Sequence, residues 1–201
     1  MKLKYKDWSE ISIRKYYDLE GLTEENEIVA CLCEESIDEV SNLPYDEYLK
    51  LKSQLGWLKE FSFDTKHELR KIKIGNRKYR VEDDWSRFTT GQYVDFQNFY
   101  AKGDLRTYYG YVLATFLIPR RKKGYNQGYD VAEEARYIYD NLDIQRANQL
   151  MFFFLRRWQG SITVILSYLK WILKKYQKKK DLPEEVKKKI EETLAIPGLV
   201  L

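Results

Sequence analysis

The chain has 201 residues, of which 44% are hydrophobic and 33% are charged, a balance typical of a folded globular protein and not of a disordered one. Its net charge of +4 hides an acidic first part, because residues 1–60 carry 8 basic and 14 acidic side chains. No segment shows the uniform excess of cations that is typical of proteins that neutralise nucleic-acid phosphates, so charge alone does not indicate a nucleic-acid-binding protein.

Two copies of one short motif, at residues 7–19 and 84–96, organise the chain. They align without gaps and share five of thirteen residues, including a tryptophan. Two copies of such a motif indicate two related structural units. The recurring positions are Trp8 and Trp85, Ser12 and Thr89, Tyr16 and Tyr93, and Asp18 and Asp95.

The recurring residues match the start of a helix. Ser12 and Thr89 stand where an N-cap belongs, because a hydroxyl there accepts a hydrogen bond from a free backbone amide. Tyr16 and Tyr93 fall four residues later, where each is predicted to pack against the apolar residue before the cap in a hydrophobic staple. In the second copy Gln92 completes a capping box.

A short alternating stretch precedes each copy, at residues 3–5 and at residues 79–81. Each unit is therefore predicted to consist of a strand, a buried tryptophan and a capped helix. Asp18 and Asp95 lie one turn inside their helices, where a carboxylate is more often exposed or paired with a cation than catalytic.

Further helices are predicted from apolar residues spaced three and four apart. In the first half they span residues 28–33, 34–43 and 44–58, the last beginning at Pro44. In the second half they span residues 108–118, ending before Pro119, and residues 131–141 and 144–158.

A β-hairpin is predicted between the two halves, at residues 71–81. Gly75 and Asn76 form a two-residue turn between alternating strands, which pairs Ile72 with Tyr79 on one face. The other face then carries four cations, Lys71, Lys73, Lys78 and Arg80.

A basic loop follows Pro119 and ends at Asp130. Its cations and tyrosines are suited to gripping an anion or a nucleic acid. The alternative, which we favour, is a solvated loop whose tyrosines pack back onto the protein while Asp130 caps the next helix. The candidate partner-binding residues here are Arg120, Arg121, Lys122, Lys123, Tyr125 and Tyr129.

A helix is predicted at residues 162–176, after Gly160 and Ser161, with a narrow polar stripe and an otherwise apolar surface. Such a helix lies on a membrane surface or, as we favour, buries its wide face inside a protein or at a protein–protein contact. No run reaches the roughly 18 to 20 apolar residues that cross a bilayer. The candidate partner-binding residues are Tyr168, Trp171, Lys174 and Lys175.

The residues needed for catalysis or metal binding are not recognisable in the sequence. His67 is the single histidine, in a charged stretch, and a lone imidazole supports no mechanism. Cys31 and Cys33 are two residues apart on a predicted helix, which makes them a poor metal or disulfide pair and fits a reducing compartment. We therefore expect a non-enzymatic protein with no cofactor and no metal, and the first residues lack the apolar core of a signal peptide.

The sequence resembles small assembly proteins of tailed bacteriophages. The similarity lies in the motif at residues 8–19, the apolar helix at residues 27–33 and the acidic stretch at residues 34–44 that ends in leucine and proline. In the second half it lies in residues 95–99 and 116–119 and in the Gly-Tyr-Asp at 128–130. These are packing motifs, so the resemblance implies tail or baseplate assembly through protein contacts and no active site.

The predicted fold class is mainly α (α+β), with two related strand–helix bundle modules joined by a β-hairpin and an additional C-terminal amphipathic helix. The predicted domains are residues 1–63, a hairpin linker at 64–82, a second module at 83–160 and a C-terminal segment at 161–201.

The predicted function is phage morphogenesis, as a tail assembly chaperone or a small tail or neck subunit. The expected partners are phage tail or neck proteins, with a homo-oligomer also compatible, in the cytoplasm of a bacterial host or in the virion. The alternative is a nucleic-acid-binding accessory protein that uses residues 120–123 and the basic C-terminal segment.

Overall fold

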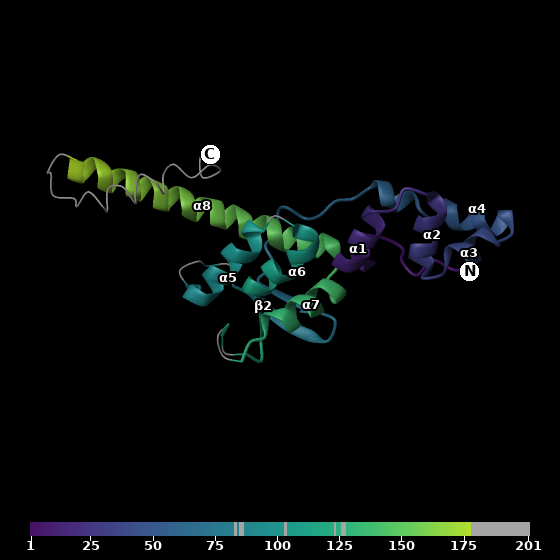
Figure 1. Cartoon of the computed structure of the whole chain (residues 1–201), viewed down its shortest axis with the longest axis horizontal. Helices are drawn as coiled ribbons and strands as arrows, with labels where there is room; N and C mark the ends of the chain where they lie inside the picture. Colours follow the sequence, from purple (N-terminus) through teal and green to yellow (C-terminus); the bar gives the residue numbers. More distant parts are fainter. Residues whose placement is uncertain (83, 85–86, 103, 123, 126–127, 178–201) are drawn as a thin grey trace. The chain divides into compact units, whose positions relative to one another are not determined.

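The protein is mainly helical, with a small antiparallel sheet of three strands, as the composition and periodicity predicted (Figure 1). A computed structural model describes all residues except 83, 85–86, 103, 123, 126–127 and 178–201. For residues 105 and 161–177 it describes the backbone alone.

The first part of the chain contains four short α-helices and two turns of 3-10 helix. They are η1 (Trp8–Glu10), α1 (Ile13–Glu20), α2 (Glu25–Cys33), α3 (Ile37–Ser41), α4 (Tyr45–Ser53) and η2 (Gly56–Lys59). The remaining elements are β1 (Lys71–Ile74), β2 (Arg77–Val81), α5 (Thr90–Ala101), α6 (Leu105–Phe116), β3 (Leu117–Pro119), α7 (Val131–Asn141) and α8 (Ile144–Gln177).

The first copy of the motif forms a capped helix start, as predicted. The hydroxyl of Ser12 accepts a hydrogen bond of 3.2 Å from the amide of Lys15. Trp8 is buried, and its indole N–H donates to the carbonyl of Trp57, 3.1 Å away. The Tyr16 ring lies 5.9 Å from the Trp8 ring, so the aromatic residues of this copy form one packed group.

The strand predicted before this copy is absent, so that part of the prediction was wrong. Residues 3–5 belong to an irregular segment in which the amide of Lys4 donates to the carbonyl of Leu32 at 2.9 Å. This contact joins the segment to the end of helix α2. The alternating pattern reflects Leu3 turning into the core, at 6% exposure, and not a ladder of strand hydrogen bonds.

The second copy forms the complete capping box. The amide of Gln92 donates to the Thr89 hydroxyl, while the Gln92 side chain accepts from the Thr89 amide, both at 3.2 Å. Strand β2 precedes it, as predicted. Tyr93 is 47% exposed, which does not match the buried staple expected of it. Trp85 lies outside the described residues.

The hairpin has the predicted register, with Ile72 opposite Tyr79 and Lys73 opposite Lys78. Gly75 takes a positive φ of 51° at the turn, which favours glycine. The sheet gains a third strand that the sequence did not predict, because β3 pairs with β2 through residues placed in the helix before Pro119. Helix α6 ends at Phe116, and the three apolar residues that follow are buried in an extended conformation.

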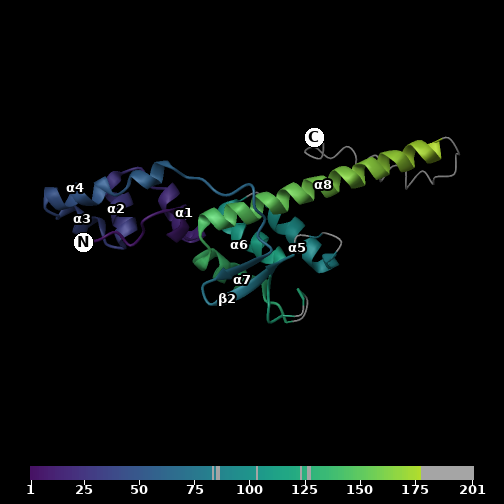
Figure 2. The same cartoon turned by 180° about the vertical axis from the view of Figure 1, so that it is seen from behind.

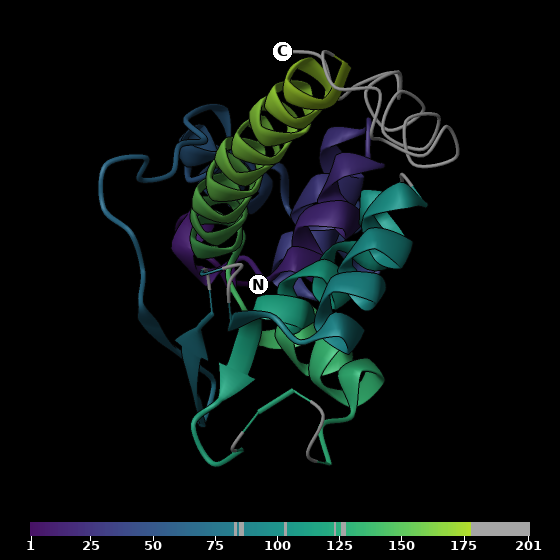
Figure 3. The ribbon, with the colours of Figure 1, turned by 90° about the vertical axis from the view of Figure 1, so that its left-hand side faces the viewer.

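Helix α7 lies against one face of the sheet, as the two opposite views show (Figures 1 and 2). The Tyr79 hydroxyl donates to Glu134 at 2.6 Å, and the Tyr137 hydroxyl donates to Asn76 at 2.8 Å. Helices α5 and α6 pack side by side, as does the pair α6 and α7 (Figure 3). Their facing side chains form the core of the second half, which includes Phe96, Tyr109, Val112, Leu113, Phe116 and Ile138.

The turn between α7 and α8 is tied to the first copy of the motif. The amide of Ile13 donates to the carbonyl of Leu142 at 3.0 Å, and the amide of Ile144 donates to the carbonyl of Ile11 at 2.8 Å. Ser12 and Asp143 thereby form an isolated β-bridge. The described residues of both copies belong to one compact unit, Met1–Phe153, and the division into modules at 1–63 and 83–160 stays a prediction.

A second unit comprises Phe154–Leu201. Helix α8 continues through Gly160 and Ser161 to Gln177, so the predicted break between two helices at these residues is not present. A glycine inside a helix costs roughly 1 kcal/mol relative to alanine, which a long helix tolerates.

Candidate functional site: an arginine-lined cleft

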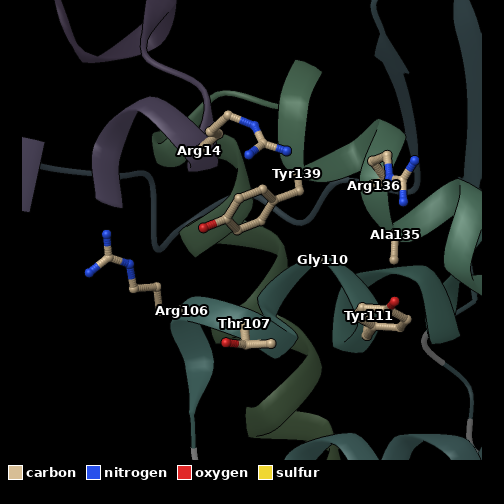
Figure 4. Close-up of a pocket in the computed structure, with 8 residues that line it drawn as sticks. All are labelled: Arg14, Arg106, Thr107, Gly110, Tyr111, Ala135, Arg136 and Tyr139. Carbon is tan, nitrogen blue, oxygen red and sulfur yellow. The ribbon is translucent and has the colours of Figure 1, made fainter. Parts of the chain in front are cut away.

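A cleft of about 360 Å³ lies where helices α1, α6 and α7 meet (Figure 4). Three arginines line it, one from each helix. The rest of the lining is small or aromatic. The complete lining is Arg14, Arg106, Thr107, Gly110, Tyr111, Ala135, Arg136 and Tyr139.

The floor of the cleft depends on a glycine. A Cβ atom at Gly110 would lie 2.5 Å from the carbonyl oxygen of Ala135 and 3.1 Å from the Cβ of Tyr139. Helices α6 and α7 approach this closely because residue 110 has no side chain. Gly110 and Ala135, the two helix positions in this contact, both line the cleft.

Arg14 is the most constrained of the three arginines. Its Nε lies 2.5 Å from a carboxylate oxygen of Asp140, and its guanidinium carbon lies 5.3 Å from the centre of the Tyr139 ring. The hydrogen bond to Asp140 raises the pKa of Arg14. Tyr139 stacks in turn on Tyr17, with ring centroids 6.3 Å apart and planes inclined by 9°. This end of the cleft is therefore held in place by packing.

Arg106 and Arg136 are exposed and, within the part of the chain that the structure describes, form no ion pair. Figure 4 shows Arg14 and the Tyr139 ring in the middle of the view, with Arg106 on one side of them and Arg136 and Ala135 on the other. Burial raises the pKa of Tyr139, while the two nearby arginines act in the opposite direction. The cleft thus offers guanidinium groups that are free to bind.

Acidic residues limit the positive charge of the cleft. Asp140 is paired with Arg14, and Asp104 accepts a hydrogen bond from the Thr107 hydroxyl at 2.5 Å while capping α6. Asp18 and Asp104 both act on the pKa of Tyr139. A cleft lined by arginines with aspartates close by suits a ligand with one or two carboxylates better than a polyanion, because the nearby aspartates repel any further negative charge.

The polar groups of the cleft point to binding through charge and hydrogen bonds. The Thr107 hydroxyl of the lining donates to the Asp104 carboxylate that caps α6. Guanidinium groups recognise carboxylates through paired hydrogen bonds, and arginine and tyrosine are the residues that contribute most to protein interfaces. The geometry of the cleft is therefore suited to binding an acidic group.

The tyrosines of the basic loop pack inward, in agreement with the favoured alternative. Tyr125 is 5% exposed and donates to Asp95 at 2.8 Å, and Tyr129 donates to the carbonyl of Ala114 at 2.6 Å. Burial raises the pKa of both phenols. Asp130 accepts hydrogen bonds from two amides at the start of α7. Both hydroxyls are thus bonded within the protein, and the prediction that these two tyrosines bind a partner stays a prediction.

The cations of that loop are exposed where they are described. Arg120 and Arg121 lie on the surface, and Lys122 donates to the carbonyl of Gly128 at 2.8 Å. Lys123 lies outside the described residues.

The remaining predicted site residues divide into two groups. Asp18 is exposed, and Asp95 accepts a hydrogen bond from the Tyr125 hydroxyl. The four residues predicted on the C-terminal helix lie on α8, but their side chains are outside the described part of the structure: Tyr168, Trp171, Lys174 and Lys175.

The described residues contain no group of three or more potential metal ligands. His67 is exposed and pairs with Asp64 at 2.7 Å. In the described part of the chain, no helix combines the length and the apolar character that crossing a membrane requires.

The three arginines of the cleft were not singled out from the sequence. They lie far apart along the chain, in segments without unusual charge. Gly110, in the middle of an apolar helix, is the residue from which the cleft could have been predicted, because a glycine inside a helix often marks a close contact between helices.

Comparison of the chain with protein-family models, with curated proteins and with solved structures finds no match.

Proposed function

We propose that the protein acts by binding other proteins, without catalysis, in the assembly of a tailed bacteriophage. The resemblance of residues 8–155 to tail and baseplate assembly proteins supplies the biological setting. The observation that carries the binding role is the cleft between α1, α6 and α7, where Arg106 and Arg136 are exposed and free of ion pairs within the described residues.

The proposed ligand of the cleft is a segment of a partner protein that carries carboxylates. An arginine pair separated by an apolar floor can bind two acidic side chains, or one acidic side chain and a chain terminus. Tyr111 and Tyr139 supply the rigid aromatic surface that accompanies arginine in protein interfaces. The aspartates beside the arginines favour a peptide of mixed charge over a nucleic acid.

A second surface of the first part of the chain supports the same role. Three apolar side chains on α3 and α4 are exposed: Ile37 at 49%, Tyr45 at 72% and Leu49 at 41%. Tyr45 and Leu49 are four residues apart and so share one face of α4. The first turns of the same two helices carry carboxylates, and protein interfaces commonly combine an apolar centre with a polar rim.

The proposed function is tested with the tail and neck proteins encoded beside the gene. The wild-type chain is expected to retain at least one of them in a pull-down, and the double variant Arg106→Glu/Arg136→Glu to lose about tenfold or more in affinity. The double variant Lys59→Glu/Lys66→Glu changes the net charge equally at two exposed lysines outside the cleft and outside helices α3 and α4, and is expected to bind as the wild type does. Failure of the wild-type chain to bind any of these proteins would refute the proposal.

Mass spectrometry of purified virions distinguishes an assembly chaperone from a structural subunit of the tail or neck. A chaperone leaves the assembled particle and is expected to be missing from it, whereas a structural subunit is expected at a fixed ratio to the other tail or neck proteins.

A further inference from the structure

The outer face of the three-stranded sheet carries a cluster of cations, which we call the basic face: Lys71, Lys73, Lys78, Arg80 and Arg120. Lys73 lies directly opposite Lys78, and Lys71 lies directly opposite Arg80. The amide of Arg120 donates to the carbonyl of Lys78 at 2.8 Å, which extends the pairing of β2 and β3 by one residue. Lys73, Lys78 and Arg120 therefore form a row across the three strands.

Like charges placed directly opposite each other destabilise a sheet, since their Cβ atoms lie about 5 Å apart. Lysines on the edge strand β1 have a structural explanation, because charge on an edge prevents pairing with other chains. That explanation extends to Arg120, which continues the other edge strand β3, but it does not cover Lys78, which lies on the central strand. The row is better explained by an anion that it binds.

The two faces of the sheet differ in how their cations are neutralised. On the face covered by α7, Arg77 pairs with Glu133 at 3.1 Å and with Glu134 at 2.9 Å. On the basic face, Lys71, Lys73, Lys78 and Arg120 have no ion pair among the described residues, and all four are exposed. The positive charge on this side is thus available to a partner.

We propose that the basic face binds the phosphate backbone of duplex nucleic acid. Successive side chains on one face of a strand are about 6.7 Å apart, so Lys71 and Lys73 on β1, with Lys78 opposite Lys73, present cations at a regular spacing to an array of phosphates. The described residues of this face include no aromatic ring, and Tyr125 and Tyr129 of the adjacent loop are bonded into the core. Single strands depend on aromatic stacking, so a duplex is the ligand that this surface fits.

This site is independent of the cleft, because the two share no residue. Its contacts are to phosphates and not to base edges, so binding is expected to be insensitive to sequence and strongly dependent on salt.

The test uses the full chain and a fluorescent DNA duplex, with a single strand of the same length as a second probe. For duplex DNA the logarithm of the binding constant is expected to fall linearly with the logarithm of salt concentration, by about 0.9 for each phosphate contact. The variant Lys73→Gln/Lys78→Gln is expected to reduce this slope by about 1.8 and to weaken binding about tenfold near 0.15 M salt.

Two control variants assign the effect to the basic face. Lys50→Gln/Lys59→Gln removes the same charge elsewhere, and Arg106→Glu/Arg136→Glu alters the cleft; both are expected to keep the duplex affinity within about twofold. Circular dichroism of every variant checks that the hairpin substitutions leave the fold intact.

Four results would overturn the proposal. They are wild-type binding that vanishes near 0.15 M salt, tighter binding of the single strand than of the duplex, an equal loss in the Lys50/Lys59 control, and binding of phosphatidylserine vesicles as strong as that of the duplex. Because the proposed protein–protein function is measured with other partners and other variants, either proposal can fail without the other.

Discussion

The hydroxyl of Tyr79 donates a hydrogen bond of 2.6 Å to a carboxylate oxygen of Glu134, and both side chains are buried. The other carboxylate oxygen accepts from Arg77 at 2.9 Å. A buried charge is tolerated only when it is paired and hydrogen-bonded, so these three residues join the sheet to α7 as a unit. Burial and the neighbouring carboxylate raise the pKa of Tyr79, which keeps its hydroxyl protonated as the donor.

Replacing Tyr79 with phenylalanine removes this donor and little else. A hydrogen bond to a charged group contributes about 1.5–3 kcal/mol, so Tyr79→Phe is expected to lower the free energy of unfolding by that amount. Urea denaturation at neutral pH measures it. Tyr45→Phe serves as the control, since Tyr45 is 72% exposed, and is expected to change stability by less than about 0.5 kcal/mol. Equal effects of the two variants would contradict the role of Glu134.

The contact at Gly110 predicts a steric effect. A Cβ there would lie 2.5 Å from the backbone oxygen of Ala135, which cannot turn aside as a side chain would. Gly110→Ala is therefore expected to destabilise the protein by about 1–3 kcal/mol, through separation of α6 and α7. Gly21→Ala is the matched control, because a Cβ at Gly21 meets nothing within 4 Å. A neutral result for Gly110→Ala, by urea denaturation, would show that the helices are not in this contact.

The N-cap of α5 predicts a difference between two adjacent threonines. Thr89 caps the helix through its hydroxyl, whereas Thr90 is the first helical residue and is exposed. Thr89→Ala is expected to cost about 0.5–2 kcal/mol, and Thr90→Ala less than about 0.5 kcal/mol. Both are measured by the shift of the urea midpoint, and a larger effect at Thr90 would rule out the assigned cap.

The buried tyrosines predict a loss of stability in alkali. Burial, the largest cause, raises the pKa of Tyr17 to about 12, against a value near 10 in the unfolded chain. Above pH ~10 the unfolded state releases the proton first, so stability is complete below that pH and declines as the pH rises towards 12. Urea midpoints between pH ~8 and ~11.5 measure the decline, which Tyr17→Phe is expected to make less steep. An identical slope in the variant would place Tyr17 in a solvated site.

Local features of this protein were predictable from short stretches of sequence. The Ser12 and Thr89 caps, the Gly75-Asn76 turn and the bounds of α7 all depend on residues within a few positions of each other. Predictions that relied on alternation alone were less successful. Residues 3–5 alternate without forming a strand, because no partner strand lies beside them.

At β3 the sequence predicted a helix where the structure has a strand. Leu117 and Ile118 continue an apolar helical pattern, so periodicity assigned them to the helix. In the structure the unpaired edge of β2 offers hydrogen bonds to residues that precede Pro119, and pairing with that edge decides their conformation. Such a choice depends on a segment nearly forty residues away in sequence and is not encoded locally.

By itself, the sequence determined the helical class, the helix caps and the hairpin register. It also determined that four cations lie on one face of the sheet and Tyr79 on the other, since all of these features depend on residues close together in the chain. Tertiary structure alone decided which cations are neutralised. The packing of α7 pairs Arg77 with Glu133 and Glu134, whereas Lys78 and Arg120 form no ion pair among the described residues. It also brings the three arginines of the cleft together from distant segments of the chain. The physical reason is that an ion pair or a cleft depends on distance in space, which only the packing of the helices sets.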